Sequence, residues 1–297
     1  MTHWLQAARI RTLPLSLSGI IMGSLLAFST HVFDFGLFFL ALLTASLLQI
    51  LSNFANDYGD GIRGTDKNKK GETRMVASGL ISHQKMKIAI GLLVFLSLIS
   101  GIFLLWKAFG IDYLGYLLLF LVLGAGAVLA AIYYTMGKNP YGYKGWGDFF
   151  VFLFFGWIGV LGAYFLQTKE ISFLLLLPAS AIGLLSAAVL NLNNLRDYET
   201  DKIANKKTMV IILGITKAKI YHTVLLIFPF VFMVIFLFIS NHIEPKNFVF
   251  LILLIPILIH LKKVWQTKDT AFLDGELKKI GILTFVFTLF STLPLVL

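Results

Sequence analysis

Long apolar segments and short polar segments alternate along the whole chain. A helix that crosses the apolar core of a bilayer needs about 20 mostly apolar residues, and the sequence contains nine segments of this kind. They lie near residues 12–30, 36–56, 86–106, 112–134, 148–167, 171–195, 220–240, 246–262 and 279–296. The pattern predicts an all-α fold, a polytopic membrane bundle of about nine transmembrane helices, with residues 1–297 forming a single integral membrane domain.

The composition supports a membrane protein and excludes several kinds of site. Hydrophobic residues make up 58% of the chain and charged residues 13%, whereas a soluble domain has roughly 25% charged residues. The absence of cysteine excludes disulfides, thiolate zinc sites and a cysteine nucleophile. Gly124 and Gly126 suit close packing between membrane helices. The six histidines form no recognised metal-ligand spacing, so we expect loop or interface positions for them.

Basic residues are concentrated on one side of the predicted membrane path. The polar segments on the side of the N-terminus contain 22 of the 25 Lys and Arg residues, and the other side contains only Lys107, Lys169 and Lys246. Lys and Arg near helix ends are retained on the cytoplasmic side. The pattern therefore predicts a multi-pass protein of the cell membrane with a cytoplasmic N-terminus. This placement of basic residues also accounts for the net charge of +10. We therefore expect the lipid bilayer as a partner and no nucleic acid.

The second predicted helix ends in a polar sequence at the cytoplasmic side. Asn53 and Asp57 are four residues apart, as are Asn56 and Asp60, and Asp57 and Asp60 are three apart. On a helix these offsets place side chains on one side, so the amide and carboxylate oxygens are expected to face one pocket. Asp66 follows Gly64, where we expect the helix to have ended and the chain to fold back.

The sixth predicted helix ends in a second polar sequence of the same chemical type. Asn191, Asn194, Asp197 and Asp201 follow one another at offsets of three, three and four residues. The two acidic segments lie on different helices but at the same membrane face, so they can converge across the core of a bundle. Together they are predicted to hold a pair of hard cations.

The residues around the aspartates point to a bound diphosphate. Mg²⁺ takes oxygen ligands and is usually bound by a few carboxylates together with substrate phosphates. Basic side chains that can neutralise phosphate oxygens flank the two segments, at Arg63, Arg74, Lys202, Lys206 and Lys207. A single charge near a helix end is more often an interfacial anchor. However, seven of the 15 acidic residues lie in these two segments, which favours a functional site.

The two segments resemble the signatures of the UbiA superfamily of intramembrane aromatic prenyltransferases, NDxxDxxxxxD and NxRDxxxD. The first reads NDYGDGIRGTD here, from Asn56 to Asp66, and the second reads NNLRDYETD, from Asn193 to Asp201. The run NPYGYKGWGD at 139–148 adds to the resemblance, which begins at ARIRTLPLSLSGIIMG near the N-terminus and covers roughly two thirds of the chain.

Two positions depart from the usual pattern of the superfamily. Ile10 and Arg11 stand where relatives commonly have a Pro-Lys pair, and Glu72 stands where a proline is usual. Both positions lie outside the aspartates. They are therefore expected to change details of phosphate contact and not the reaction.

The resemblance implies a role for each polar residue. It implies nine helices around a central cavity that opens sideways to lipid, with the long cytoplasmic loops forming a cap. The catalytic residues are expected to be Asp57, Asp60, Asp197 and Asp201. The same four, with Asn56, Asp66 and Asn193, are expected to bind Mg²⁺. The substrate-binding residues are expected to be Asn53, Arg63, Arg74, Asn194, Lys206, Lys207, Tyr134 and Tyr141. For the two tyrosines, a place in the interfacial aromatic belt is the more common alternative.

The implied reaction is Mg²⁺-dependent transfer of a polyprenyl group from polyprenyl diphosphate to an aromatic acceptor. The motifs are most similar to the branch of the superfamily that acts on 1,4-dihydroxy-2-naphthoate, which implies decarboxylation and demethylmenaquinol as the product. Another acceptor, such as 4-hydroxybenzoate, is an alternative. A CDP-alcohol phosphatidyltransferase is a less favoured alternative, because the sequence after Asp60-Gly61 differs from the motif of that class.

A cation-coupled transporter is also less favoured. It would have acidic residues near the membrane midplane, whereas here they lie at the cytoplasmic edge.

Overall fold

The computed structural model describes residues 2–65 and 73–297, and these residues are almost entirely helical. Among them, nine segments are long and apolar enough to cross a membrane. These segments are Thr2–Phe28, Phe35–Arg63, His83–Phe109, Leu114–Tyr133, Gly147–Thr168, Phe173–Arg196, Ile215–Ile239, Pro245–Gln266 and Thr270–Val296. All nine predicted spans are confirmed, and the protein is a multi-pass membrane protein.

The spans are built from one or more helices each. The first four spans contain α1 (Thr2–Ala8), η1 (Ile10–Thr12), α2 (Leu13–Phe28), α3 (Phe35–Arg63), α4 (His83–Phe109) and α5 (Leu114–Tyr133). After η2 (Tyr141–Tyr143), the next two contain α6 (Gly147–Val151), the π-helix η3 (Phe152–Leu161), α7 (Gly162–Thr168), η4 (Phe173–Leu175) and α8 (Leu176–Arg196). The remainder forms α9 (Tyr198–Ile203), α10 (Met209–Leu213), α11 (Ile215–Ile239), η5 (Pro245–Leu253), α12 (Leu254–Gln266), η6 (Thr270–Leu273) and α13 (Asp274–Val296).

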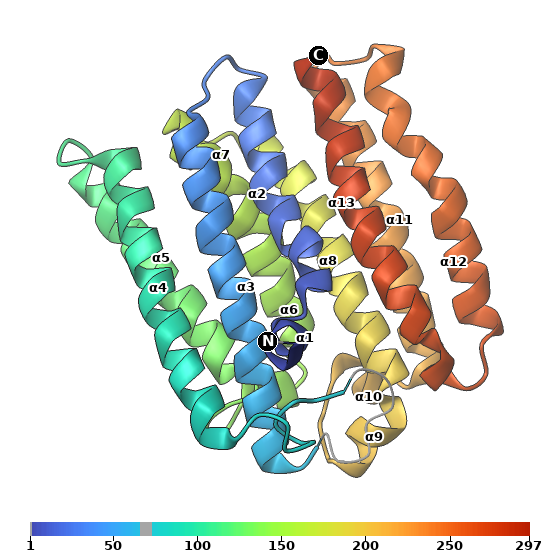
Figure 1. Cartoon of the computed structure of the whole chain (residues 1–297). Coiled ribbons are helices and arrows are strands. Elements are labelled where there is room, and N and C mark those ends of the chain that lie inside the picture. The colour runs from blue at the N-terminus through green and yellow to red at the C-terminus, as the bar shows by residue number, and fades with distance from the viewer. Residues whose placement is uncertain (1, 66–72) are drawn as a thin grey trace.

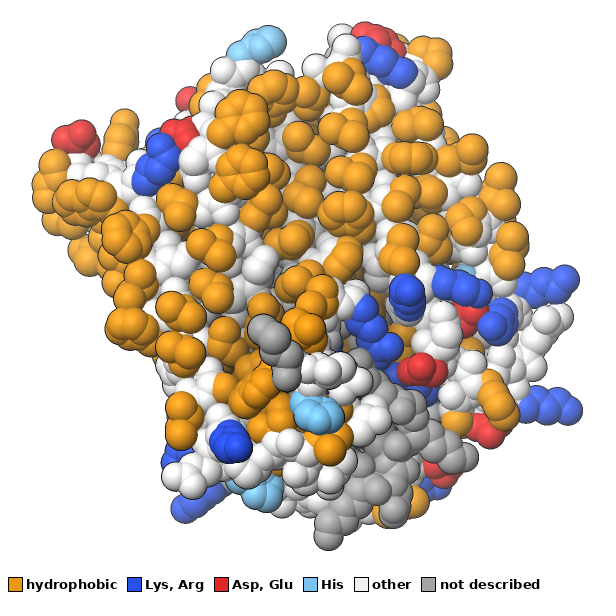
Figure 2. Space-filling model, in the orientation of Figure 1, with side chains coloured by type: hydrophobic (Ala, Val, Ile, Leu, Met, Phe, Trp, Pro, Cys, Tyr) orange, Lys and Arg blue, Asp and Glu red, His pale blue; other side chains and the backbone are white. Residues whose placement is uncertain are grey.

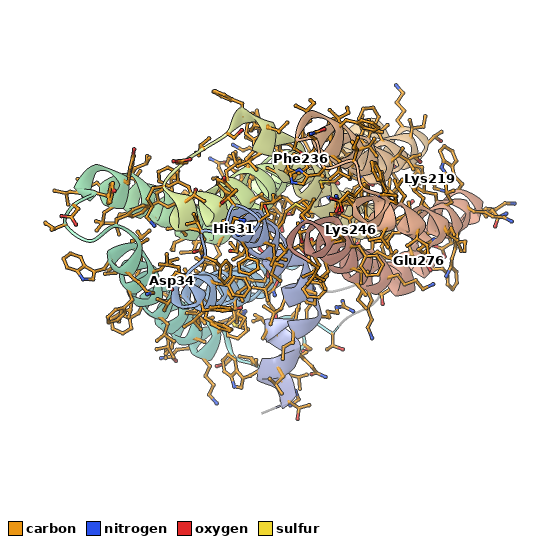
Figure 3. All side chains as sticks on the ribbon, turned by 90° about the horizontal axis from the view of Figure 1, so that it is seen from above. His31, Asp34, Lys219, Phe236, Lys246 and Glu276 are labelled. Atoms are coloured by element: carbon orange, nitrogen blue, oxygen red, sulfur yellow. The ribbon has the colours of Figure 1, made fainter. Side chains whose placement is uncertain are left out.

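The helices form two groups with α8 between them. Helices α3, α4 and α5 lie on one side of the bundle, and α11, α12 and α13 lie on the other (Figures 1 and 3). One hydrophobic core joins α8 to α11, α12 and α13, and a second core joins α1, α3, α4 and α5. A third core joins α3 and α4 to α7, and a central cavity is lined by residues of both groups.

Both acidic segments lie at the same end of the bundle, which we call the motif end. It is the lower end in Figure 1, where α3 and α8 finish and the short helices α9 and α10 cover the bundle. The predicted cap is therefore present in its second half, and residues 66–72 of its first half lie outside the described residues. Hydrophobic side chains cover the middle of the face shown in Figure 2, and most of its Lys and Arg side chains gather toward the motif end.

Glycines bring α2 and α8 close to the span of α6, η3 and α7. A Cβ atom added to Gly19 or Gly23 would overlap a backbone carbonyl oxygen of this span. A Cβ atom at Gly183 of α8 would lie 2.7 Å from the ring of Phe152 in the same span. By contrast, a Cβ at Gly124 or Gly126 would meet no atom of the described residues within 4 Å. The prediction of close packing at Gly124 and Gly126 is therefore wrong, because the faces of α5 that carry them have no helix against them.

Two histidines occupy the core and not the surface. His222 of α11 and His260 of α12 are buried, and their Nε2 atoms are 2.9 Å apart. The Nδ1 of His260 lies 2.8 Å from a carboxylate oxygen of Glu276 on α13. The prediction of loop or interface positions is wrong for this pair. Glu276 lowers the free-energy cost of burying the two rings, because it supplies a hydrogen-bond partner for His260 that neither α11 nor α12 offers.

Candidate active site

The first motif occupies the last turns of α3. The helix continues to Arg63 and ends at Gly64, whose φ of 74° is the left-handed conformation that glycine adopts readily. Asn53, Asp57 and Asp60 are 4%, 1% and 3% exposed, so the predicted polar side faces inward. Carboxylates buried in this way need compensating partners.

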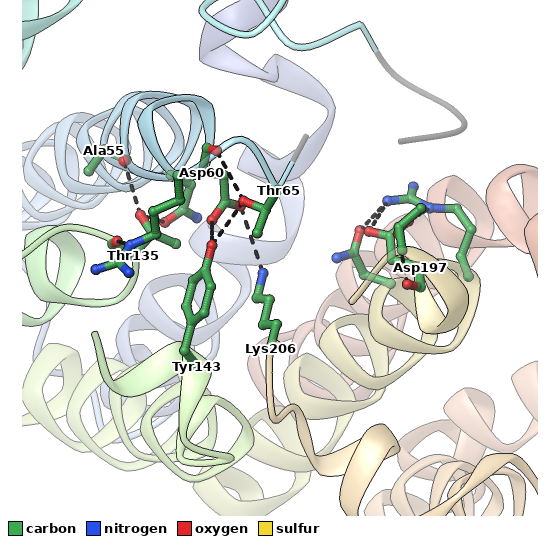
Figure 4. Close-up of polar contacts among 12 residues, drawn as sticks. Ala55, Asp60, Thr65, Thr135, Tyr143, Asp197 and Lys206 are labelled. Carbon is green, nitrogen blue, oxygen red and sulfur yellow. Dashed lines mark hydrogen bonds and ion pairs between the residues drawn. The ribbon is translucent and has the colours of Figure 1, made fainter. Parts of the chain in front are cut away.

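Asp60 is compensated by residues from distant segments (Figure 4). The hydroxyl of Tyr143 donates to Asp60 Oδ1 at 2.7 Å, and the Nζ of Lys206 lies 3.7 Å from Oδ2. Arg63 and Lys206 stand over the Tyr143 ring, 5.1 and 5.0 Å from its centroid. Burial, and then the neighbouring Asp60, raise the pKa of the Tyr143 phenol far above its ordinary value, so the hydroxyl stays protonated and remains a donor.

Asp57 holds the backbone that follows the first motif. Its two carboxylate oxygens accept from the N–H groups of Met75 at 3.1 Å and Val76 at 3.4 Å. These bonds fix the turn that begins beside Arg74, a buried residue that reaches the central cavity. Asp57 therefore holds the backbone at Met75 and Val76 in place, and its role as a metal ligand stays a prediction.

Asn53 and Asn56 also tie α3 to neighbouring segments. The side-chain amide of Asn53 donates to the carbonyl of Ala8 at 2.8 Å and to the hydroxyl of Thr12 at 3.1 Å. This fixes the turn at Arg9, whose φ of 47° is unusual for a residue with a side chain. Asn56 accepts from the hydroxyl of Thr135 at 3.3 Å.

Arg9 and Arg11 line the cavity, and Arg9 is close enough to Asp57 to interact with it electrostatically. Neither arginine was among the predicted site residues. Their position in the ARIRT segment was visible in the sequence, but its spacing alone does not show that the chain folds back onto α3. The contact with Asn53 supplies that information.

The second motif is organised by Arg196. The Nε and Nη2 atoms of its guanidinium donate to the two oxygens of Asp197 at 2.7 and 2.8 Å. Nη2 also lies 2.8 Å from Asn193 Oδ1, and Nη1 lies 2.7 Å from Asp274 Oδ1 on α13. Both Arg196 and Asp197 are buried. Arg196 was not predicted as a site residue, although it lies within the quoted motif.

The predicted residues differ in whether they reach the cavity. Those that line the cavity are Asn53, Asn56, Asp60, Arg74, Tyr134, Tyr141, Asn193, Asn194 and Lys206. The hydroxyl of Tyr141 donates to the carbonyl of Ala130, and burial raises the pKa of this phenol. Asp201 is buried on α9, and like Asp57 and Asp197 it is not part of the cavity wall. Arg63 and Lys207 are exposed, and Arg63 donates to the carbonyls of Thr135 and Gly137. Asp66 lies outside the described residues.

The cavity has a volume of about 720 Å³. Its motif end is polar and basic, and the rest of its wall is mainly apolar. Among the described residues, no three Asp, Glu or His side chains are grouped closely enough to hold one metal ion by themselves. The donor set still fits Mg²⁺, since this ion is usually bound by one or two carboxylates together with substrate phosphates and water.

The fold and the site together define a class of protein, a polytopic helical membrane protein in which two Asp/Asn motifs adjoin one end of a largely apolar cavity. The chain belongs to the UbiA prenyltransferase family, which matches residues 16–273. This confirms the resemblance on which the residue roles were based.

Similar proteins of known name come from several bacteria. The chain is 45% identical over 242 residues to the 1,4-dihydroxy-2-naphthoate octaprenyltransferase of Escherichia coli (strain K12), covering 80% of this chain and 77% of that protein. It is 36% identical over 224 residues to the protein of the same name from Mycobacterium tuberculosis, covering 75% of this chain and 74% of the relative.

Solved structures share the fold at low sequence identity. A UbiA homolog from Archaeoglobus fulgidus bound to DMAPP and Mg²⁺ has a TM-score of 0.62 and 17% identity, and the match covers 98% of each chain. The apo structure of a UbiA homolog from Aeropyrum pernix K1 has a TM-score of 0.67 and 14% identity, covering 94% of this chain and 98% of that one.

The Arg196 geometry predicts a distinctive loss of stability. Arg196→Gln leaves the buried Asp197 carboxylate without its cation, and breaking such a pair costs roughly 3–5 kcal/mol. Asp274→Asn should cost much less, because its side chain is 40% exposed and solvent screens the pair. Thermal unfolding in detergent measures both variants. Equal losses, or an unchanged Arg196→Gln protein, would contradict the assignment.

Proposed function

We propose that the protein transfers a polyprenyl group from polyprenyl diphosphate to 1,4-dihydroxy-2-naphthoate, releasing diphosphate and CO₂ and giving demethylmenaquinol. The observation that carries the proposal is the cavity itself, because it joins a buried polar and basic end to a long apolar wall. A polyprenyl diphosphate has the same division between an anionic head and an apolar tail. The names of the similar bacterial proteins support the choice of acceptor.

The head of the substrate would lie at the motif end. Mg²⁺ supplies positive charge that stabilises the departing diphosphate. The proposed Mg²⁺ ligands are Asn56, Asp57, Asp60, Asp66, Asn193, Asp197 and Asp201. Arg74 and Lys206 follow the two motifs in the sequence and both line the cavity, so their cations can contact phosphate oxygens there. Arg9 and Arg11 add two further cations at the same end.

The proposed reaction breaks the bond between the allylic carbon and the diphosphate oxygen. The electron-rich naphthoate ring forms a new carbon–carbon bond to the allylic cation at its carboxylated carbon, which then loses CO₂. Tyr134 and Tyr141 line the cavity with their rings 5.3 Å apart, so they can offer π-electron density to the cation. The apolar wall protects the cation, because it excludes water that would trap it.

The membrane orientation is part of the same proposal. The opposite end of the bundle carries few basic residues, and Lys107 there is paired with Asp34 at 2.8 Å. The motif end carries most of the Lys and Arg residues, which supports a cytoplasmic location for it. Soluble acceptor and Mg²⁺ would then reach the site from the cytoplasm, and the polyprenyl chain would enter from the bilayer.

A product assay tests the proposal. Detergent-purified protein receives Mg²⁺, octaprenyl diphosphate and 1,4-dihydroxy-2-naphthoate, with 4-hydroxybenzoate and EDTA in parallel reactions. We expect a decarboxylated prenyl naphthoquinol by mass spectrometry, and its loss with EDTA. Prenylation of 4-hydroxybenzoate alone would reject the acceptor but keep prenyl transfer. No product with either acceptor would reject the proposed function.

Tyr143 and Asp60 are expected to give different defects. Asp60→Asn should abolish turnover, because it removes the charge that the metal requires. Tyr143→Phe removes the 2.7 Å hydrogen bond to Asp60 and the 2.9 Å one to Thr65 but keeps the Asp60 charge. It should therefore raise the Mg²⁺ concentration for half-maximal activity by about 10-fold and leave saturated turnover largely intact.

Tyr116→Phe is the matched control for this pair, because Tyr116 lies on α5 near the opposite end. It should behave as the unmodified protein in an Mg²⁺ titration of activity. An unchanged Mg²⁺ requirement in Tyr143→Phe would show that its hydroxyl does not position Asp60. Full activity in Asp60→Asn would remove Asp60 from the metal site.

A further inference from the structure

The cavity extends from the motifs across most of the membrane. Along α3 its wall includes a residue on nearly every turn from Asp60 to Ala41. Asp60 lies 19 positions after Ala41, which corresponds to about 28 Å of helix, close to the roughly 30 Å thickness of the hydrocarbon core. Near the opposite end the wall is formed by Leu104, Phe165 and Leu166. The cavity is therefore a long channel with a polar end and an apolar arm.

The apolar arm runs along α5 and not along α13. On α13 the wall stops at Gly281, seven residues or about 10 Å from the start of the helix at Asp274. On α5 the wall continues from Ala131 through Gly124 to Leu119. An occupant that extends from the motifs toward the opposite membrane face must therefore pass Gly124.

Helix α5 presents small residues to this arm. Gly124, Ala127 and Ala131 all line it, and α5 packs mainly against α3 and α4. Among the residues of α5, all of which the structure describes, only Val128 is buried. Across the arm stand aromatic side chains of the span that begins at α6, including Phe154. On the α5 side the arm is therefore bounded by small side chains from Gly124 to Ala131 and by Leu119, Phe120 and Leu123 beyond them, and the other side carries rings.

Gly124 differs from the glycines that pack helices together. A Cβ at Gly23 would overlap the carbonyl oxygen of Val160, whereas a Cβ at Gly124 would meet no described atom within 4 Å. Any side chain at Gly124 would therefore project into space that belongs to the cavity. Gly124 lies ten residues from Tyr134, or about 15 Å up the helix from the polar end.

From this geometry we infer that Gly124 determines which prenyl chain lengths the protein accepts, by keeping the apolar arm open beyond the first part of the chain. This rests on the proposed function. A short prenyl diphosphate ends before it reaches Gly124, so it does not depend on this opening. A long one must pass between Gly124 and the aromatic wall.

The test is a substitution series at Gly124 with two substrates. Purified Gly124→Ala, Gly124→Leu and Gly124→Phe are assayed with geranyl diphosphate and with octaprenyl diphosphate. We expect kcat/KM for the octaprenyl substrate to fall progressively, by at least about 10-fold in Gly124→Phe relative to the geranyl substrate, since each methylene that no longer fits costs roughly 10-fold or more. Geranyl transfer should remain close to that of the unmodified protein, which also shows that the variants fold.

Gly126→Phe is the matched control. Gly126 lies on the same helix, also has open space at its Cβ, and is not part of the cavity wall. The change has the same effect on helix propensity, so it should leave the ratio of the two kcat/KM values within about twofold. Gly281→Phe tests the alternative route toward α13, and it should not alter chain-length preference.

Several results would overturn the inference. These are an unchanged substrate ratio across the Gly124 series, an equal shift in Gly126→Phe, a shift confined to Gly281→Phe, or a raised KM for the naphthoate with no change in chain-length preference. If Gly124→Phe is too large to fold, the ratio in Gly124→Leu decides the question. Failure of the proposed function is recognised separately, because the unmodified protein would then transfer neither prenyl group.

Discussion

The structure depends on keeping several carboxylates charged inside a membrane bundle. An uncompensated charge in such a place is costly. In each motif, different partners compensate the carboxylates. Asp60 has Tyr143 and Lys206, Asp57 has two backbone N–H groups, and Asp197 has the guanidinium of Arg196. These partners come from helices and turns on both sides of the cavity. Compensation of the charges therefore also holds the motif end together.

Because buried charges need partners, the cavity is divided into a polar end and an apolar arm. Polar and basic groups are confined to the motif end, where short helices and turns supply partners for them. Beyond that end the wall offers mainly apolar contacts, so it favours hydrocarbon over water. This division suits a substrate with an anionic head and an apolar tail. Close glycine contacts at α2 and α8 make one side of the channel firm, while α5 leaves the other side open.

Helical periodicity and membrane length account for what the sequence predicts well. The nine spans and the inward polar side of α3 follow from local patterns, as does the helix end at Gly64. The partners of the motifs do not, because Tyr143 is 83 residues from Asp60 and Asp274 is 78 residues from Arg196. The sequence also does not show which atoms surround a glycine. A glycine that packs against another helix, such as Gly23, is therefore not distinguished in the sequence from Gly124, which faces open space. The buried His222 and His260 pair depends on Glu276, a partner on a third helix.

The central claim is that the two motifs bind one diphosphate between them. It is tested most directly by a cryo-electron microscopy structure of the protein with Mg²⁺ and an unreactive prenyl thiolodiphosphate. The account predicts that the diphosphate lies between Asp60 and Asp197 at the motif end, with the chain directed into the apolar arm. A diphosphate bound by only one motif, with the other still closed by its own internal contacts, would contradict it.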